Sequence, residues 1–171
     1  MFKLDFILHM LTSPNKTFQT VIKHDMLQMA VLIVFISTFL FALGDFLLFG
    51  SKQLVSYIAT FPLYFIGSFI SSWFSVKVFK SKGNFRKTLI VWGFANAPFL
   101  LFSVINVPLA LIALQEPSIY IIIGLIAVVT AIWVLILDVK GFMIAHKVGV
   151  WKSIIATLLS IILGIISVVL V

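Results

Sequence analysis

The sequence contains no cysteine, which excludes a disulfide framework, a thiolate metal site and a cysteine nucleophile. It is also poor in charge: charged residues make up 10% of its 171 residues, whereas a soluble domain has about 25%. Only five residues are Asp or Glu. So little charge cannot cover a globular fold with a water-compatible surface, and the 63% hydrophobic content excludes a disordered protein.

Long apolar runs take the place of the missing charge. A membrane-spanning helix needs about 20 mostly apolar residues, and five segments meet this requirement: 26–49, 54–79, 88–114, 118–144 and 151–171. These runs are continuous, whereas the strands of a membrane β-barrel alternate in polarity. We therefore predict an all-α, polytopic integral membrane protein with five transmembrane helices. Its parts are an N-terminal segment, 1–25, and a five-helix transmembrane domain, 26–171.

The N-terminal segment is predicted to be an amphipathic helix at the cytoplasmic interface. Asp5 and His9 interrupt its apolar run and no small-residue cleavage site follows, which argues against a secretory signal. In a helix, Asp5, His9 and Thr12 share one face, as in an interfacial helix. Ser13 and Pro14 would then begin a second short helix as its N-cap and first residue. A frayed polar tail is the alternative.

The positive charges are distributed unevenly. Eleven of the twelve Lys and Arg residues fall in the N-terminal segment or around the connections after the second and fourth apolar runs, on one side of the predicted bundle. The opposite side has Lys52. Because short basic loops mark the cytoplasmic side, we predict a cytoplasmic N-terminus and a C-terminus outside. The net charge of +7 then reflects topology and anionic headgroups rather than nucleic acid.

The connection between the second and third spans is the most basic stretch of the chain. Its charged residues are Lys77, Lys80, Lys82, Arg86 and Lys87. Two interpretations stay open: the charges only set topology, or they form a binding patch for anionic lipid or an acidic partner. The second interpretation places Gly83 at the turn and Phe85 in the interface as an anchor.

Polar residues inside the apolar runs are costly and need a reason. Asn96 precedes Pro98, and Asn106 precedes Pro108, in the third run. Each proline frees a carbonyl one turn earlier. The pattern indicates either a discontinuous helix that lines a polar cavity or a kinked helix whose Asn side chains bond within the bundle.

Asp138 lies near the cytoplasmic end of the fourth run. We predict that it forms a structural ion pair with Lys77, Lys80 or Lys87 and so joins the second, third and fourth spans. Lys140 is an unsuitable partner, because residues two apart do not share a helix face.

Small residues recur at helical spacing in two runs, a pattern that lets helix backbones approach closely. One row lies in the second run and the other in the fifth; they are Gly67, Ser71 and Ser75, and Ala156, Ser160 and Gly164. Packing within the chain is the favoured interpretation, and a homodimer contact is the alternative.

The residues needed for catalysis do not cluster. The histidines, His9, His24 and His146, form no HExxH arrangement, and the five acidic residues are spread along the chain without a carboxylate pair. We expect no catalytic residue, no metal ligand set and no cofactor, and hence a protein that is not an enzyme.

Three stretches resemble the Yip family of Ypt/Rab-interacting-protein-like membrane proteins. They are Lys80-Ser-Lys-Gly83-Asn-Phe85-Arg-Lys-Thr88-Leu followed by Gly93-Phe-Ala-Asn-Ala97-Pro98, then Leu11-Thr-Ser-Pro14-Asn-Lys-Thr17-Phe18, and finally Trp133 to Gly141 with His146 and Lys152. The resemblance implies a five-helix membrane fold. It also implies a link to vesicle trafficking, in which eukaryotic relatives bind small GTPases through longer cytoplasmic N-terminal regions.

Residues 1–25 are short for that docking role, so the chain resembles the compact prokaryotic members. We expect a scaffold or adaptor in membrane organisation, trafficking or complex assembly. The alternative is a small transporter, a channel or an accessory subunit of a transport complex. Expected partners are anionic lipid headgroups and other membrane proteins, such as a transport ATPase or a small GTPase. The expected location is the plasma membrane, or the endoplasmic reticulum or Golgi in a eukaryote.

Overall fold

The computed structural model describes the backbone of residues 4–50 and 52–169, and the side chains of residues 6–50, 62 and 64–162. Over these residues the chain is helical and has no strand. The helices are α1 (Leu4–Thr12), α2 (Pro14–Lys23), α3 (Leu27–Phe49), α4 (Lys52–Phe79), α5 (Phe85–Ala95), α6 (Ala97–Ala113), α7 (Ile119–His146) and α8 (Val150–Val169).

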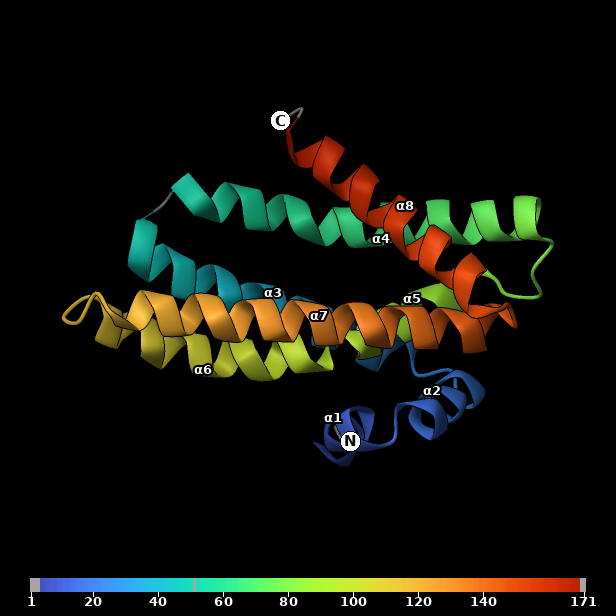
Figure 1. Cartoon of the computed structure of the whole chain (residues 1–171), viewed down its shortest axis with the longest axis horizontal. Coiled ribbons are helices and arrows are strands. Elements are labelled where there is room, and N and C mark those ends of the chain that lie inside the picture. Colours follow the sequence, from blue (N-terminus) through green and yellow to red (C-terminus); the bar gives the residue numbers. More distant parts are fainter. Residues whose placement is uncertain (1–3, 51, 170–171) are drawn as a thin grey trace.

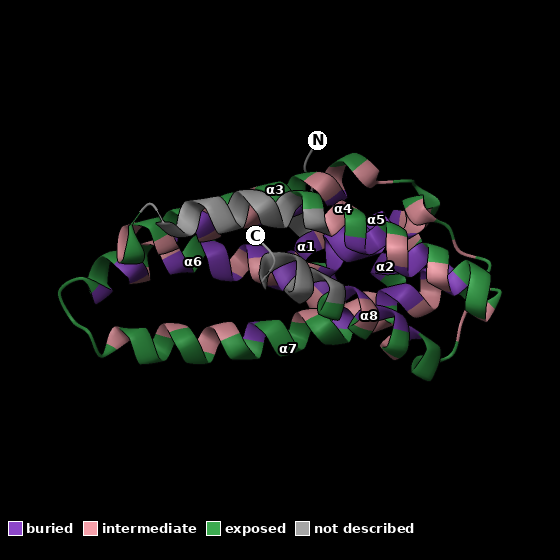
Figure 2. Ribbon diagram, turned by 90° about the horizontal axis from the view of Figure 1, so that it is seen from above, coloured by how far each residue is buried: buried purple, intermediate pink, exposed green. Residues whose placement is uncertain are grey.

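The long helices form an elongated bundle (Figure 1). Helices α3, α4 and α7 follow its long axis, α5 and α6 together make one further crossing, and α8 crosses α4 obliquely. The short helices α1 and α2 lie beside the bundle, where α2 contacts α5 and α7, and α1 contacts α5 and α6. Figure 2 shows buried residues concentrated around α5, while much of α7 is exposed. Because the exposed face of α7 is apolar, it is suited to lipid.

Three of the predicted spans are confirmed as helices long and apolar enough to cross a membrane. They are α3, the combined segment Phe85–Ala113, and α7. The other two predicted spans coincide with α4 and α8, parts of which fall outside the described side chains. The count of five and the orientation of the termini therefore remain predictions, but the all-helical class and the membrane character are established.

The third span is broken at Asn96. The Nδ2 of Asn96 donates a hydrogen bond to the carbonyl of Trp92 (2.8 Å), and the backbone N–H of Asn96 closes the end of α5. Pro98 then occupies the first turn of α6, where it needs no amide hydrogen. This bond is to Trp92 and not to the carbonyl of Phe94, which is the one that Pro98 frees, so the choice between the two interpretations stays open. Pro108, in contrast, lies inside an uninterrupted α6, so the second Asn-Pro pair does not break the helix.

Helices α3 and α5 meet at Gly93. A Cβ atom on Gly93 would lie 2.6 Å from both the Cβ and the carbonyl oxygen of Ala30. These contacts leave no room for a side chain. Because α5 is buried from Thr88 to Ala95, this crossing lies in the middle of the core.

The amphipathic N-terminal segment is helical, so the alternative of a frayed tail is wrong. Ile7, Met10, Phe18 and Val21 are buried against the bundle. The ring of Phe18 fills the space at Gly141 of α7, where a Cβ would lie 2.9 Å from two ring atoms. The apolar face of the segment therefore covers protein. Ser13 holds the N-cap position before Pro14, but its side chain makes no capping hydrogen bond.

The two rows of small residues pack against each other. Gly67, Ser71 and Ser75 are buried, and the Oγ of Ser71 donates a hydrogen bond to the carbonyl of Ala156 in α8 (3.0 Å). The site of a Cβ on Gly67 is 3.6 Å from the Cβ of Ser160. Packing within the chain is thus confirmed for the described part of both rows; the side chain at position 164 lies outside it.

Ser71→Leu is expected to destabilise the α4–α8 contact by about 1–3 kcal/mol, since added methylenes must be forced into a packed interface. Thermal unfolding in mild detergent measures this. Ser71→Ala removes only the hydrogen bond and should cost about 1 kcal/mol. Val78→Leu is the matched control on the exposed side of α4, where Val78 is 55% exposed. If Ser71→Leu and Val78→Leu have equal effects, the face of α4 that carries Ser71 does not pack as described.

Candidate functional site

Two connections far apart in the sequence meet at one end of the bundle. The α4–α5 connection, 80–84, and the α7–α8 connection, 147–149, are joined by a hydrogen bond from the backbone N–H of Lys82 to the carbonyl of His146 (3.2 Å). The N–H of Ser81 also bonds back to the carbonyl of Ser75 (3.2 Å). The α4–α5 connection is therefore tied to the ends of two helices.

His146 fixes this connection with both of its ring nitrogens. Its imidazole is fully buried, with Nδ1 2.8 Å from the Ser81 hydroxyl and Nε2 2.7 Å from the Thr88 hydroxyl. It stacks on Phe142, the ring centroids being 4.1 Å apart. We call Ser81, Thr88, Phe142 and His146 the histidine cluster.

Both ring nitrogens of His146 have a hydroxyl partner when the ring is neutral. One nitrogen carries the hydrogen and donates it, and the other accepts a hydrogen bond from the hydroxyl that faces it. The Thr88 hydroxyl also lies 3.1 Å from the carbonyl of Asn84, which is a second acceptor for its proton. The neutral ring therefore satisfies both hydroxyls, and the cluster is suited to hold the connection in place.

Gly83 is needed for the close approach of the connection to this ring. A Cβ on Gly83 would lie 2.3–2.6 Å from three imidazole atoms of His146. The sequence predicts Gly83 at a turn, and the structure adds that its missing side chain makes room for His146. The histidine cluster itself was not predicted, because Ser81 and Thr88 lie 65 and 58 residues from His146 in sequence.

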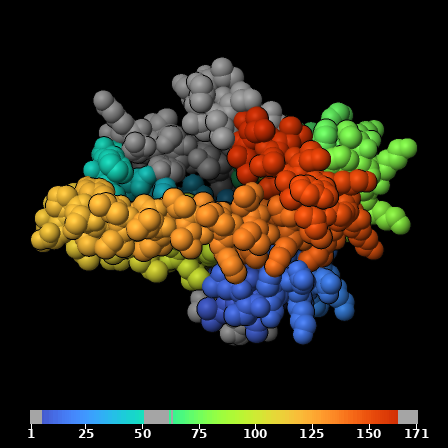
Figure 3. All heavy atoms as spheres, in the orientation of Figure 1, coloured from blue at the N-terminus to red at the C-terminus, as the bar shows by residue number. Residues whose placement is uncertain are grey.

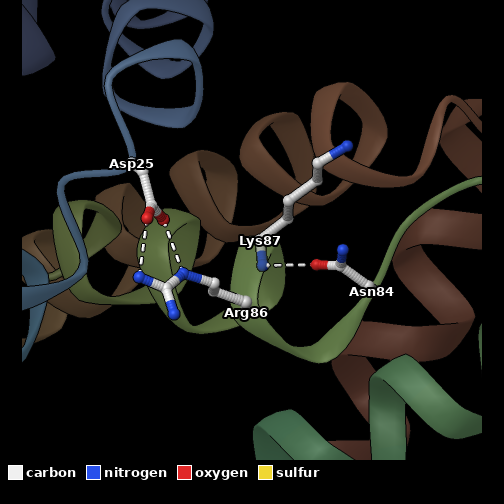
Figure 4. Close-up of polar contacts among 4 residues, drawn as sticks. All are labelled: Asp25, Asn84, Arg86 and Lys87. Carbon is white, nitrogen blue, oxygen red and sulfur yellow. Dashed lines mark hydrogen bonds and ion pairs between the residues drawn. The ribbon is translucent and has the colours of Figure 1, made fainter.

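An ion pair closes the same end from the other side. The guanidinium of Arg86 makes two hydrogen bonds to Asp25, from Nε to Oδ1 (2.7 Å) and from Nη2 to Oδ2 (2.6 Å) (Figure 4). Asn84 begins α5, since its Oδ1 accepts a hydrogen bond from the N–H of Lys87 (2.9 Å). The side chain of Lys87 extends away from the ion pair. Arg86 therefore links the α2–α3 connection to α5.

The Arg86 hydrogen bonds lower the pKa of Asp25 below its ordinary 3.8. A lowered carboxyl pKa in the folded state stabilises the fold above pH 3.8, and this stabilisation is lost as the pH falls through the lowered pKa. Both side chains are more than half exposed, so the contribution is small. The ion pair also means that the charge of Arg86 is already paired, unlike the lysine charges of the predicted patch.

The lysines at this end are mostly free to reach a ligand. Lys77, Lys80 and Lys82 are exposed and Lys87 is half-buried. Exposed lysines of the α7–α8 region add to the charge: Lys147, and Lys152, whose Nζ lies 5.7 Å from the ring centroid of Phe79. We call these six lysines the basic end. Phe85, whose role as a membrane anchor stays a prediction, packs edge-on against Phe69 of α4, with centroids 5.7 Å apart.

The predicted ion pair of Asp138 is not formed. Its Oδ1 is buried and has no hydrogen-bond partner among the described residues, and no described Lys77, Lys80 or Lys87 side chain pairs with it. Asp138 lies eight residues before His146, which is about 12 Å along the axis of α7. The lysines extend from the end of the bundle, too far from that buried position.

Asn106 is the most isolated polar group of the third span. It is fully buried, and neither its Oδ1 nor its Nδ2 has a partner within the described part of the chain. It faces Gly44 of α3, where the site of a Cβ is 2.4 Å from Nδ2. It thus meets a neighbouring helix at a glycine but gains no hydrogen bond there.

Metal chemistry has no support in the described residues, which contain no group of three or more His, Cys, Asp or Glu side chains able to hold an ion.

Comparison with known families is decisive for identity: the model of the Yip1 domain matches residues 8–171. The chain belongs to the Yip1 family. No curated protein and no solved structure matches this Yip1-family chain. The family resemblance of the three sequence stretches is therefore confirmed, and with it a membrane protein; Yip1 proteins are not a known enzyme family.

Proposed function

We propose that this Yip1-family protein is a non-enzymatic scaffold or adaptor that crosses the membrane five times, with its basic end in the cytoplasm. The basic end would hold an acidic segment of another membrane protein. One observation carries the proposal: exposed Lys80 and Lys82 belong to a connection that His146 fixes through Ser81 and Thr88. The backbone that carries the two lysines is thereby held in place before a partner arrives.

Fixed charges bind an acidic segment better than mobile ones, because less loop entropy is lost on association. They also steer encounter and favour partners of opposite charge. Lysines at a cytoplasmic membrane surface are worth about 1 kcal/mol each toward anionic headgroups, within a Debye length of about 8 Å. Headgroups can therefore occupy the basic end until an acidic segment displaces them. A transport ATPase or a small GTPase with such a segment would suit it, in the plasma membrane or, in a eukaryote, the endoplasmic reticulum or Golgi.

Lys80→Gln/Lys82→Gln is expected to weaken partner capture about 30-fold, because two charges worth about 1 kcal/mol each are removed. The measurement is affinity purification in mild detergent, with quantitative mass spectrometry at low and high salt. Lys16→Gln/Lys23→Gln removes the same charge from α2 and is the matched control. A partner lost in high salt and in the first variant alone supports the proposal. Equal capture by both variants and the wild type would refute it.

A second candidate function, transport or service to a transport complex, is favoured by Asn106. A buried amide without a partner in the third span is the kind of group that lines a polar path. Purified protein in liposomes distinguishes the two functions. Solute flux that Asn106→Leu abolishes would select transport, whereas the scaffold proposal expects no flux from either protein.

A further inference from the structure

A groove lies between α2, α7 and α8, separate from the α4–α5 connection, with a volume of about 660 Å³. The three helices meet on the face seen in Figure 3, with α7 between α2 and α8. The apolar floor of the groove comes from α7 and α8. It includes Leu135, Ile136, Val139, Ile154 and Leu158.

The polar residues of the groove are Lys140 of α7 and Asn15 and Gln19 of α2, and all three side chains are exposed. The apolar residues Met143, Ile144 and Val150 also line the groove and lie nearer the basic end than Lys140 does. Since α7 runs toward the basic end and α8 runs away from it, Leu135 and Leu158 lie deeper in the bundle. Leu135 is about 7.5 Å from Lys140 along the axis of α7. The groove thus combines one positive charge and two amide side chains with an apolar floor.

The charge in the groove is positive and uncompensated within the lining. Lys140 is the one charged residue among the residues that line the groove. Asp138 is two residues away, and two residues turn a helix by about 200°, so its carboxylate is on the opposite side of α7. An ammonium group beside two amide donors matches a phosphodiester anion.

We propose that this groove binds one anionic glycerophospholipid, with its phosphate at Lys140, Asn15 and Gln19 and an acyl chain along Ile154 and Leu158. Basic pockets between helices at the cytoplasmic side of membrane proteins suit such headgroups. The site does not depend on the proposed adaptor function, because none of its lining residues belongs to the α4–α5 connection.

The test is native mass spectrometry of the delipidated protein with phosphatidylglycerol or phosphatidylcholine of identical chains. Wild type is expected to retain one phosphatidylglycerol more tightly than phosphatidylcholine. Lys140→Gln should weaken phosphatidylglycerol roughly fivefold, to the level of phosphatidylcholine. Ile154→Trp, which fills the groove, should remove both lipids. The matched controls are Lys147→Gln, an exposed lysine outside the groove, and Val104→Trp on the exposed side of α6.

Equal retention of the two lipids by the wild type would overturn the site, as would identical behaviour of Lys140→Gln and Lys147→Gln. A dimer that Ile154→Trp dissociates would show a second copy of the chain in the groove instead. Lys80→Gln/Lys82→Gln should retain the lipid as the wild type does; if it loses the lipid, the basic end holds the headgroup and the groove does not. Lys140→Gln should keep full partner capture. The lipid site and the adaptor function can therefore be refuted separately.

Discussion

Gly93→Ala is expected to lower the free energy of unfolding by about 3 kcal/mol, the upper end of the usual cost of overpacking a core. The new methyl group would lie 2.6 Å from the carbonyl oxygen and the Cβ of Ala30. A flexible side-chain tip can move away from such a contact, but the backbone of α3 cannot move without shifting the whole helix. Unfolding by heat or by SDS titration in mild detergent measures the loss.

Gly124→Ala is the matched control for Gly93→Ala. Gly124 also lies inside a long helix, α7, but a Cβ there would meet nothing within 4 Å. Replacing an unencumbered helical glycine by alanine stabilises a helix by about 0.5–1 kcal/mol. The two variants should therefore change stability in opposite directions. A similar small gain in both would mean that α3 and α5 do not meet closely at Ala30.

His146→Ala is expected to cost about 3 kcal/mol and to release the α4–α5 connection. Removing a fully buried ring leaves a cavity, and the hydroxyls of Ser81 and Thr88 lose their imidazole partner. Limited trypsin digestion at Lys80 and Lys82 measures the release directly, because a fixed connection is cleaved slowly. Thermal unfolding measures the loss of stability.

His146→Phe separates packing from hydrogen bonding in this cluster. A phenyl ring keeps most of the volume and can stack on Phe142, but it bonds neither hydroxyl. We expect intermediate stability and cleavage nearly as fast as in His146→Ala. Wild-type cleavage rates in both variants would contradict the role assigned to the histidine cluster.

The sequence predicted those features that depend on local pattern. The apolar runs located α3, α5–α6 and α7, and helical spacing placed Gly67 and Ser71 on a packed face, because both signals lie within one helix. The amphipathic pattern predicted α1 and α2 correctly. It could not tell whether their apolar face meets lipid or protein, because Phe18 is equally apolar in either surrounding.

The features that sequence analysis missed all depend on which helices become neighbours. The pairing of Asp25 with Arg86 joins residues 61 apart, and the bonds of His146 to Ser81 and Thr88 span similar separations. Asp138 was predicted to pair because lysines occur at the same end of the bundle. The structure places Asp138 too deep in the bundle for these lysines. The distribution of charges along the sequence therefore does not show which oppositely charged side chains can meet.

The orientation of the basic end can be measured by cysteine labelling, because the sequence contains no cysteine of its own. A single cysteine is introduced at Lys82, at Glu116 in the connection between α6 and α7, or at Val171, and sealed cells are treated with a membrane-impermeant maleimide. If the basic end faces the cytoplasm, E116C and V171C are labelled in intact cells and K82C is labelled only after lysis. Labelling of K82C in intact cells, with E116C protected, would contradict this orientation.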